Sequence, residues 1–328
     1  MSGSGNVSEH RTIFVNDDTV GDLADWASVV RALDAAYAGD VSDEMVPMRT
    51  MARGDGFWMR TLSAISPSGQ TFGCKIIAAS PRKKRASYLI PLWDQQTMDL
   101  VALIDGSRIT GLRTAGTGAV AVGLLAPRRP LKVGILGSGF ESRGLLAAVQ
   151  VNSQVAEARV FSPTQANREK FAADFGIMAA ASAEEAVDGA DLVLCAARAY
   201  GEEPTLQGRW LAPHATVVSV GSTLPEQREV DAETLARAAL IVADMPEEVL
   251  HETGDALAAS AAGVDLAAKT VALGDLAGGR VARPEGIAIY KSVGSALQDI
   301  VIAEMILQRA QAASRFFEMP ESIHTIIK

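Results

Sequence analysis

The sequence predicts an α/β protein that combines a doubly wound parallel-sheet domain with a second, α+β domain. From residue 131 onward, short apolar segments alternate with helical segments, which is the β-α rhythm of a parallel sheet. Residues 56–104 differ, because Pro, Gly, Ser and charged residues separate their four apolar runs in the manner of an antiparallel sheet. A chain of 328 residues is long enough for two domains of roughly 150 residues each.

The composition excludes several classes of protein. The chain has 39 acidic residues against 30 Lys and Arg, and a net charge of −9 argues against a general nucleic-acid binder. Its two cysteines and four histidines are scattered, so neither a disulfide framework nor a metal site is predicted. The sequence has neither a signal-peptide pattern nor an apolar run long enough to cross a membrane. We therefore expect a soluble, cytoplasmic protein with no membrane partner.

The first part of the chain is expected to place two helices beside the antiparallel sheet. Residues 22–38 carry apolar side chains at helical spacing, and residues 109–125 form a helix rich in small residues. The four strands are expected at 57–65, 72–80, 86–94 and 100–106. The segment Ala-Pro-Arg-Arg-Pro at 126–130 then breaks the chain and marks a domain boundary.

The second part of the chain is expected to form the parallel sheet. Strands are predicted at 132–136, 158–161, 177–178, 191–196, 216–220 and 240–243, with helices ending at 150 and spanning 167–175 and 183–187. A long last helix, 292–313, comes late enough to leave this domain and pack on the first. The predicted domains are therefore 1–128 completed by 302–328, and 129–301.

A glycine-rich turn follows the first strand of the parallel sheet. Residues 137–142 read Gly-Ser-Gly-Phe-Glu-Ser, a G-x-G-x-x-S pattern between a strand and a helix. Gly137 permits a tight turn, and Gly139 lets backbone N–H groups approach a pyrophosphate at the helix N-terminus. A turn without a ligand is the alternative, but the strand–turn–helix context favours a Rossmann-type dinucleotide site. We expect the cofactor to contact Gly137, Ser138, Gly139, Phe140 and Glu141.

The end of the second parallel strand bears on the choice of dinucleotide. NAD sites usually place an acidic residue there, but residues 160–168 contain none. Ser162 and Thr164 can donate to a 2′-phosphate and Arg168 can pair with it, so NADP(H) is favoured and NAD(H) is the alternative. Arg168 also fits a simple solvated position on a helix.

Three cationic residues in the first part of the chain have mostly apolar or small neighbours in the sequence. Arg49 follows Val-Pro-Met, Lys75 sits inside an apolar strand, and Arg113 lies in a helix of small residues. Burying a cation is costly unless it is paired, so the three together suggest a preformed site for a carboxylate. Lys75 alone would also fit a side chain that snorkels from an edge strand.

The chain resembles the ornithine cyclodeaminase/μ-crystallin family. The resemblance rests on six segments in the family's order, 46–50 (VPMRT), 73–81 (GCKIIAASP), 109–119 (ITGLRTAGTGA), 133–139 (VGILGSG), 220–231 (VGSTLPEQREVD) and 289–299 (IYKSVGSALQD). It implies a substrate-binding first domain that takes back the last helix and forms a homodimer through its sheet. It also implies a small amino or imino acid as the substrate.

The resemblance assigns roles to individual residues. Arg49, Lys75 and Arg113 match the positions that bind the substrate α-carboxylate, and Lys75 also lies near the reacting nitrogen in family members. Asp231 matches the catalytic aspartate, although the Ala-Glu-Thr-Leu that follows it equally predicts a helix N-cap. The segment Ser292-Val293-Gly294 matches the stretch that borders the nicotinamide ring.

One departure from the family pattern concerns the substrate side chain. Ornithine cyclodeaminases carry a Glu between the first Arg and the Lys, but residues 50–74 contain no Glu. Arg60 lies in this stretch and would repel a cationic side chain if it faces the pocket, whereas strand alternation allows either face. Ornithine and lysine are therefore disfavoured, and a second substrate carboxylate is an option.

These observations predict an NAD(P)-dependent oxidoreductase that moves hydride between nicotinamide and the C=N or CH–NH carbon of a small 2-imino or 2-amino acid. Two alternatives stay open. One is a redox-neutral cyclodeaminase that retains its NAD, and the other is a non-catalytic binding protein.

Overall fold

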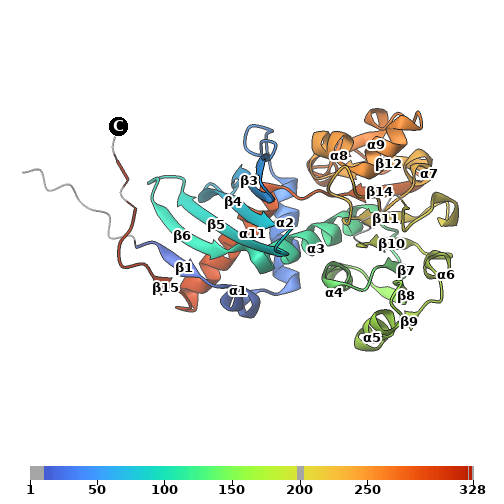
Figure 1. Ribbon diagram of the computed structural model, residues 1–328, viewed down its shortest axis with the longest axis horizontal. Helices are drawn as coiled ribbons and strands as arrows, with labels where there is room; N and C mark the ends of the chain where they lie inside the picture. The colour runs from blue at the N-terminus through green and yellow to red at the C-terminus, as the bar shows by residue number, and fades with distance from the viewer. Residues whose placement is uncertain (1–10, 198–202, 324, 327–328) are drawn as a thin grey trace, which may run out of the picture. The chain divides into compact units, whose positions relative to one another are not determined.

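The computed structural model describes residues 11–197, 203–323 and 325–326, which form two compact units (Figure 1). The first unit contains Met1–Ala24, Ser42–Thr110 and Asp299–Lys328, and the second contains Asp25–Val41 and Gly111–Gln298. One unit has a mixed sheet and the other a parallel sheet, which confirms the predicted α/β class.

The first unit is built on a seven-stranded sheet in the order β15-β1-β6-β5-β4-β3-β2. Its strands are β1 (Ile13–Val15), β2 (Thr50–Gly54), β3 (Phe57–Ile65), β4 (Thr71–Ser80), β5 (Arg85–Asp94), β6 (Leu100–Asp105) and β15 (Phe317–Glu318). Neighbouring strands from β2 to β6 run antiparallel, as the turn residues between their apolar runs predict. Among the described strands of this sheet, only β1 and β6 pair in parallel.

Two helices accompany this sheet, α1 (Asp17–Leu23) and α11 (Ala296–Ala312). From Asp299 onward, α11 lies along one face of the sheet (Figure 1). Glu304 of α11 accepts hydrogen bonds from the hydroxyls of Ser68 and Thr71, at 2.9 and 2.5 Å. Gly73 lets the helix come close, because an added Cβ would lie 3.2 Å from Cδ1 of Ile300.

The second unit is built on an eight-stranded, fully parallel sheet in the order β13-β12-β14-β11-β10-β7-β8-β9. Its strands are β7 (Leu131–Leu136), β8 (Val155–Phe161), β9 (Met178–Ala179), β10 (Leu192–Cys195), β11 (Thr216–Ser219), β12 (Ala238–Ala243), β13 (Thr270–Ala272) and β14 (Ile287–Lys291). The chain leaves β7 first toward β8 and β9 and later returns to its other side with β10. This reversal is the topological switch at which doubly wound sheets bind ligands, beyond the carboxyl ends of the strands.

Helices cover both faces of the parallel sheet (Figure 1). They are α2 (Trp26–Ala38), α3 (Gly106–Leu125), α4 (Phe140–Asn152), α5 (Gln165–Phe175), α6 (Ala183–Val187), α7 (Ala232–Arg237), α8 (Pro246–Glu252), α9 (Gly254–Ala261) and α10 (Leu273–Ala277). The apolar core on one face joins α6, α7 and α9 to the strands. On the other face, a Cβ added to Gly118 of α3 would touch both Leu145 of α4 and Val218 of β11.

Several elements differ from the sequence expectation. The helix expected at 22–38 is two helices, because Asp25 accepts a hydrogen bond from Ser28 N and starts α2 as its N-cap. The last helix begins at 296 rather than 292, and the strand β14 that precedes it was not expected. The polar tail adds the short strand β15 beside β1.

The two compact units also divide the chain differently from the expected boundaries at 128, 129 and 301. Both α2 and most of α3 belong to the second unit. The reason is their packing on α4, where a Cβ added to Gly144 would lie 3.2 Å from Ala115 and 3.4 Å from Trp26. Among the described helices, none is long and apolar enough to span a membrane.

Candidate functional site

The glycine turn lies directly after β7, at the switch point of the parallel sheet. Gly137 has a φ of +109°, and a Cβ there would lie 2.9 Å from the carbonyl oxygen of Ala196. Gly139 is the N-cap of the 13-residue helix α4 without a side-chain hydrogen bond, and a Cβ added to it would meet nothing within 4 Å. The amino end of α4 is therefore open to an approaching anion, which fits a dinucleotide pyrophosphate.

The other side chains of the turn differ in their burial. Phe140 is exposed and its ring lies against Gly111, while Glu141 is half-buried in the first turn of α4. The hydroxyl of Ser142 is buried and has no hydrogen-bond partner within the described residues. Ser142 fills the third small position of the fingerprint, close under Gly137.

The end of β8 is tied to the glycine turn. Ser138 Oγ and Ser162 Oγ lie 2.8 Å apart, and Arg168 Nη1 donates to the carbonyl of Ser162 at 3.0 Å. The Arg168 guanidinium lies 5.4 Å from the ring centroid of Phe161. Thr164 is exposed at the N-cap of α5, where its hydroxyl makes no capping bond. These three polar side chains thus surround the carboxyl end of β8, where the adenosine ribose of a bound dinucleotide is expected.

A buried carboxylate holds the segment that follows β14. Asp244 accepts from Ser292 Oγ at 2.6 Å, from Val293 N at 3.1 Å and from Gly294 N at 2.8 Å. Because Asp244 itself follows β12, the segment 292–294 is fixed at the carboxyl edge of the sheet. This is the edge that carries the glycine turn.

Arg113 belongs to the same network through an amide. Gln298 Nε2 donates to Asp244 at 3.0 Å and to Tyr37 Oη at 2.8 Å, which turns its Oε1 toward Arg113 Nη1 at 3.0 Å. Burial, with a contribution from Asp244, raises the pKa of Tyr37 far above its usual range, so this hydroxyl stays neutral. The Arg113 side chain is only 7% exposed and is held in one orientation.

Gly294 gives Arg113 the room it occupies. Its φ is +82°, and a Cβ at this position would lie 2.3 Å from Arg113 Nη1. Both the backbone conformation and the space therefore require glycine.

The first unit holds the second buried cation, Lys75. Lys75 lies in β4, is 1% exposed, and its Nζ lies 2.8 and 2.7 Å from the two carboxylate oxygens of Asp299. Asp299 is fully buried in the first turn of α11. The edge-strand alternative for Lys75 is therefore wrong, because the ammonium is enclosed and paired with a carboxylate.

The strand register settles which face of the sheet Arg60 occupies. Arg60 pairs with Ile77, two residues along β4 from Lys75, so the side chains of Arg60 and Lys75 share a face. Arg60 is half-buried, and its guanidinium lies 5.4 Å from the ring centroid of Trp58.

Arg49 falls on the same face by the same argument. It is half-buried and directly precedes β2, whose first residue Thr50 pairs with Thr61. Continuing this register places Arg49 opposite Leu62, which pairs with Lys75 on its other side. Three of the four predicted substrate-binding cations thus belong to one face of the first unit's sheet.

Asp231 is a helix N-cap, which is one of the two roles that the sequence analysis gave it. Its Oδ1 accepts from Thr234 N at 2.8 Å, Thr234 Oγ1 at 2.6 Å and Gly208 N at 2.9 Å. The carboxylate is half-buried in the second unit. Its capping role is therefore structural, and its catalytic role stays a prediction.

Several residues of these networks were missed from the sequence. Asp299 and Gln298 are consecutive residues of the segment that carried the family resemblance, where only Ser292, Val293 and Gly294 were singled out. Asp244 follows an apolar strand of a parallel sheet, which is a recognisable position for a functional acid. Among the described residues, no cluster of three or more His, Cys, Asp or Glu side chains suits a metal ion.

Comparisons with known proteins identify one family and two reductases that this chain resembles. The model of the ornithine cyclodeaminase/mu-crystallin family matches residues 20–314. The ketimine reductase mu-crystallin of Rattus norvegicus is 32% identical over 312 residues, which cover 89% of this chain and 96% of the relative. A Δ1-pyrroline-2-carboxylate reductase of Bacillus cereus (strain ZK / E33L) is 28% identical, with 76% and 80% covered.

A solved structure agrees with these relatives. The Δ1-pyrroline-2-carboxylate reductase of Thermococcus litoralis, in complex with NADH and L-proline, is similar to this chain with a TM-score of 0.85 and 25% identity. The match covers 94% of this chain and all of the other.

Proposed function

The chain belongs to the ornithine cyclodeaminase/mu-crystallin family, and we propose that it is an NAD(P)H-dependent reductase acting on the C=N bond of a small 2-imino acid. The observation that carries this proposal is the pair of buried cations, Lys75 and Arg113, each held by a side chain from the first turn of α11. The open glycine turn before α4 supplies the dinucleotide site that such a reductase needs. The reductases among the relatives support the same reaction class.

The cations provide the substrate with its carboxylate site. We assign carboxylate binding to Arg49, Lys75 and Arg113, because an arginine guanidinium can hold a carboxylate through two hydrogen bonds and so fix the neighbouring carbon. Arg113 is prepared for this role before substrate arrives, since Gln298 and Gly294 leave it one orientation. Less freedom is then lost when the substrate binds.

Proton transfer is assigned to Lys75, with Asp231 as a second candidate. A dihydronicotinamide bound at the glycine turn would supply the hydride for the imine carbon, and the imine nitrogen would take a proton as the C=N double bond becomes a single bond. The Lys75 ammonium is the donor, and Asp299 offsets its charge and keeps it in place. Asp231 then gives or takes a proton at the amine nitrogen, in addition to capping α7.

The preferred cofactor is proposed to be NADPH, with NADH as the alternative. Ser162, Thr164 and Arg168 lie around the end of β8, and residues 160–168 contain no acid to hold a ribose 2′-hydroxyl. The test is the ratio of kcat/KM for the two cofactors. A strong preference for NADH would refute this assignment without affecting the reductase proposal.

The substrate side chain is proposed to be apolar, cyclic or acidic rather than cationic. Arg60 shares the sheet face of Lys75, so an ammonium on the substrate would meet a like charge there. Activity on the imine formed from oxaloacetate and ammonia would identify Arg60 as a second carboxylate site. We also propose a homodimer, which light scattering in solution would test.

The experiment for the reaction itself follows NAD(P)H consumption with cyclic 2-imino acids and with 2-keto acids plus ammonia or methylamine. Oxidation of the cofactor in step with imine loss is expected. A redox-neutral cyclodeaminase would instead release ammonia from a diamino acid such as ornithine, with no net change in cofactor. A binding protein would take up cofactor and show neither reaction.

A further inference from the structure

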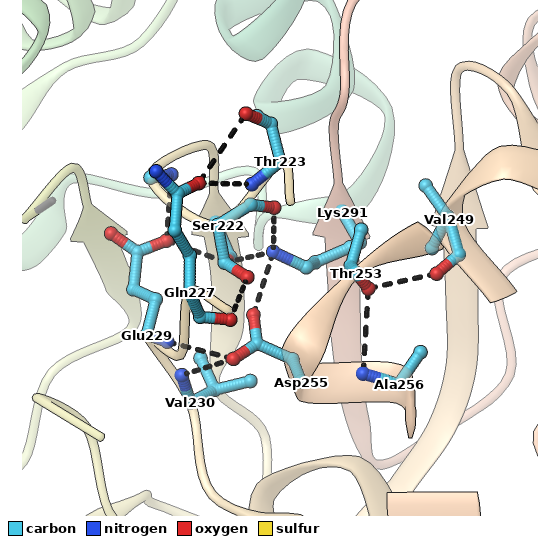
Figure 2. Close-up of polar contacts among 12 residues, drawn as sticks. Ser222, Thr223, Gln227, Glu229, Val230, Val249, Thr253, Asp255, Ala256 and Lys291 are labelled. Atoms are coloured by element: carbon cyan, nitrogen blue, oxygen red, sulfur yellow. Dashed lines mark hydrogen bonds and ion pairs between the residues drawn. The ribbon is translucent and has the colours of Figure 1, made fainter. Parts of the chain in front are cut away.

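A buried acidic network lies at the carboxyl edge of the parallel sheet, outside the residues assigned above. Its centre is Glu229, a fully buried glutamate (Figure 2). Glu229 Oε1 accepts from Ala197 N at 2.8 Å, and Oε2 accepts from Ser219 Oγ at 2.6 Å and Gly221 N at 2.9 Å. One carboxylate therefore joins the chain just after β10 to the end of β11.

Both of these segments adjoin the proposed cofactor site. Ala196, the residue before Ala197, donates its backbone N–H to the carbonyl of Leu136, and its own carbonyl limits the space at Gly137. The end of β11 is held in turn by Ser292, whose backbone N–H donates to the carbonyl of Ser219 at 3.0 Å. The Glu229 carboxylate thus binds two segments whose backbones contact the glycine turn and the segment predicted to border the nicotinamide.

The hydrogen bonds of Glu229 favour its ionised form. Lys291 Nζ donates to Ser219 Oγ at 3.1 Å, so that hydroxyl must direct its own hydrogen to Glu229. Glu229 then faces three donors, two backbone N–H groups and one hydroxyl. A proton on the carboxyl group would remove its charge and weaken these three charge-assisted hydrogen bonds.

The titratable groups that act on Glu229 within the described residues come from three elements. Lys291 of β14 lies 2.7 Å from Asp255 of α9, and Asp255 Oδ1 also accepts from the backbone N–H of Glu229 at 2.7 Å (Figure 2). Cys195 of β10 is the third titratable neighbour, and burial raises the pKa of its thiol far above its usual range, which keeps it neutral. Because Lys291 is shared with Asp255, it only partly offsets the burial of Glu229.

We propose that the Glu229 carboxylate is a positioning residue for the cofactor, fixing Ala197 after β10 and Gly221 after β11 in the arrangement that binds the dinucleotide. This inference rests on the proposed function only in taking a dinucleotide as the ligand. Burial raises the pKa of Glu229 to about 7, so its ionisation changes near neutral pH. Cofactor affinity then rises with pH as Glu229 loses its proton.

The test measures the dissociation constant of NADH by its fluorescence between pH 6 and 8.5, in the wild type and in Glu229→Gln. NADH is the probe because it lacks a 2′-phosphate that would titrate in this range. The wild type is expected to bind about tenfold more tightly as the pH rises through about 7, the size of one hydrogen bond to a charged group. Glu229→Gln presents an amide N–H to a donor, so it is expected to bind about tenfold more weakly at pH 8 with no pH dependence.

Glu304→Gln is the matched control, because Glu304 is also a buried glutamate bonded to hydroxyls but belongs to the first unit. It is expected to keep the wild-type pH profile. A flat wild-type profile, or an unchanged one in Glu229→Gln, would overturn the role of Glu229 while leaving the reductase proposal standing. The wild-type profile decides the matter even if Glu229→Gln does not fold. Failure of the wild type to bind NADH or NADPH at any pH would refute both.

Discussion

Replacing Gly294 by alanine tests whether the orientation of Arg113 controls catalysis. The added Cβ would lie 2.3 Å from Arg113 Nη1, whereas ordinary carbon contacts begin near 3.5 Å, so the guanidinium must move by about 1 Å. A displacement of that size at a substrate-binding group lowers turnover by about 100-fold. The φ of +82° adds a backbone cost of about 1–2 kcal/mol to the stability of the variant.

Gly176→Ala separates these two effects. Gly176 has a φ of +64° at the end of α5, and a Cβ there would meet nothing within 4 Å. This variant carries the backbone cost without displacing any side chain. We expect both variants to lose a few degrees in Tm, while only Gly294→Ala loses about 100-fold in kcat/KM for the imino acid. Equal activities in the two variants, or a Gly294→Ala activity within threefold of wild type, would refute the role assigned to Arg113.

Other substitutions address the remaining parts of the site. Asp299→Asn leaves the buried Lys75 ammonium without its carboxylate, so we expect thermal unfolding to show a loss of about 3–5 kcal/mol in stability. We also expect a lower kcat, and an unchanged kcat would exclude Lys75 as the proton donor. Gly139→Ala meets no protein atom, so its Tm should match wild type while NADH binding weakens at least about tenfold, and full binding would contradict the pyrophosphate assignment. Arg168→Leu should raise the KM for NADPH about tenfold and leave that for NADH unchanged, whereas equal effects on both would indicate a structural arginine. The pKa of Glu229 is raised from 4.5 to about 7, so between these pH values the folded state binds a proton that the unfolded state releases. The stability of wild type relative to Glu229→Gln should therefore fall by about 3 kcal/mol as the pH rises from 4.5 to 7.5. A difference in stability that does not change with pH would refute the raised pKa.

Local patterns predicted much of this fold. The strands β3 to β6 and β7 to β12 lie close to their expected positions because each combines an apolar run with polar or glycine-containing ends. The glycine turn was predictable because only glycine suits the φ of Gly137, and the lack of a side chain at Gly139 leaves the start of α4 open to a ligand. Short strands such as β1 and β15 were missed, since two or three residues carry no periodicity and their pairing depends on distant segments.

The site was predictable for the residues whose chemistry is conspicuous in sequence, such as Lys75 within an apolar strand. Its partners were not, because Asp299 and Gln298 lie more than 180 residues away from the cations they hold. The face occupied by Arg60 also needed the strand register, which a single sequence does not specify. Glu229 lies in a segment that carried the family resemblance but was not singled out, since a glutamate in a polar segment ordinarily indicates a solvated residue.

Reduction of the imine is measured by the loss of 340 nm absorbance when NADPH, and separately NADH, is mixed with the chain and a cyclic 2-imino acid such as Δ1-pyrroline-2-carboxylate. The reductase proposal predicts oxidation of one cofactor in a one-to-one ratio with reduction of the imine, and loss of that turnover in Lys75→Met while NADH still binds. A chain that binds the cofactor yet oxidises neither form with any cyclic imino acid, or with any 2-keto acid plus amine, would contradict it.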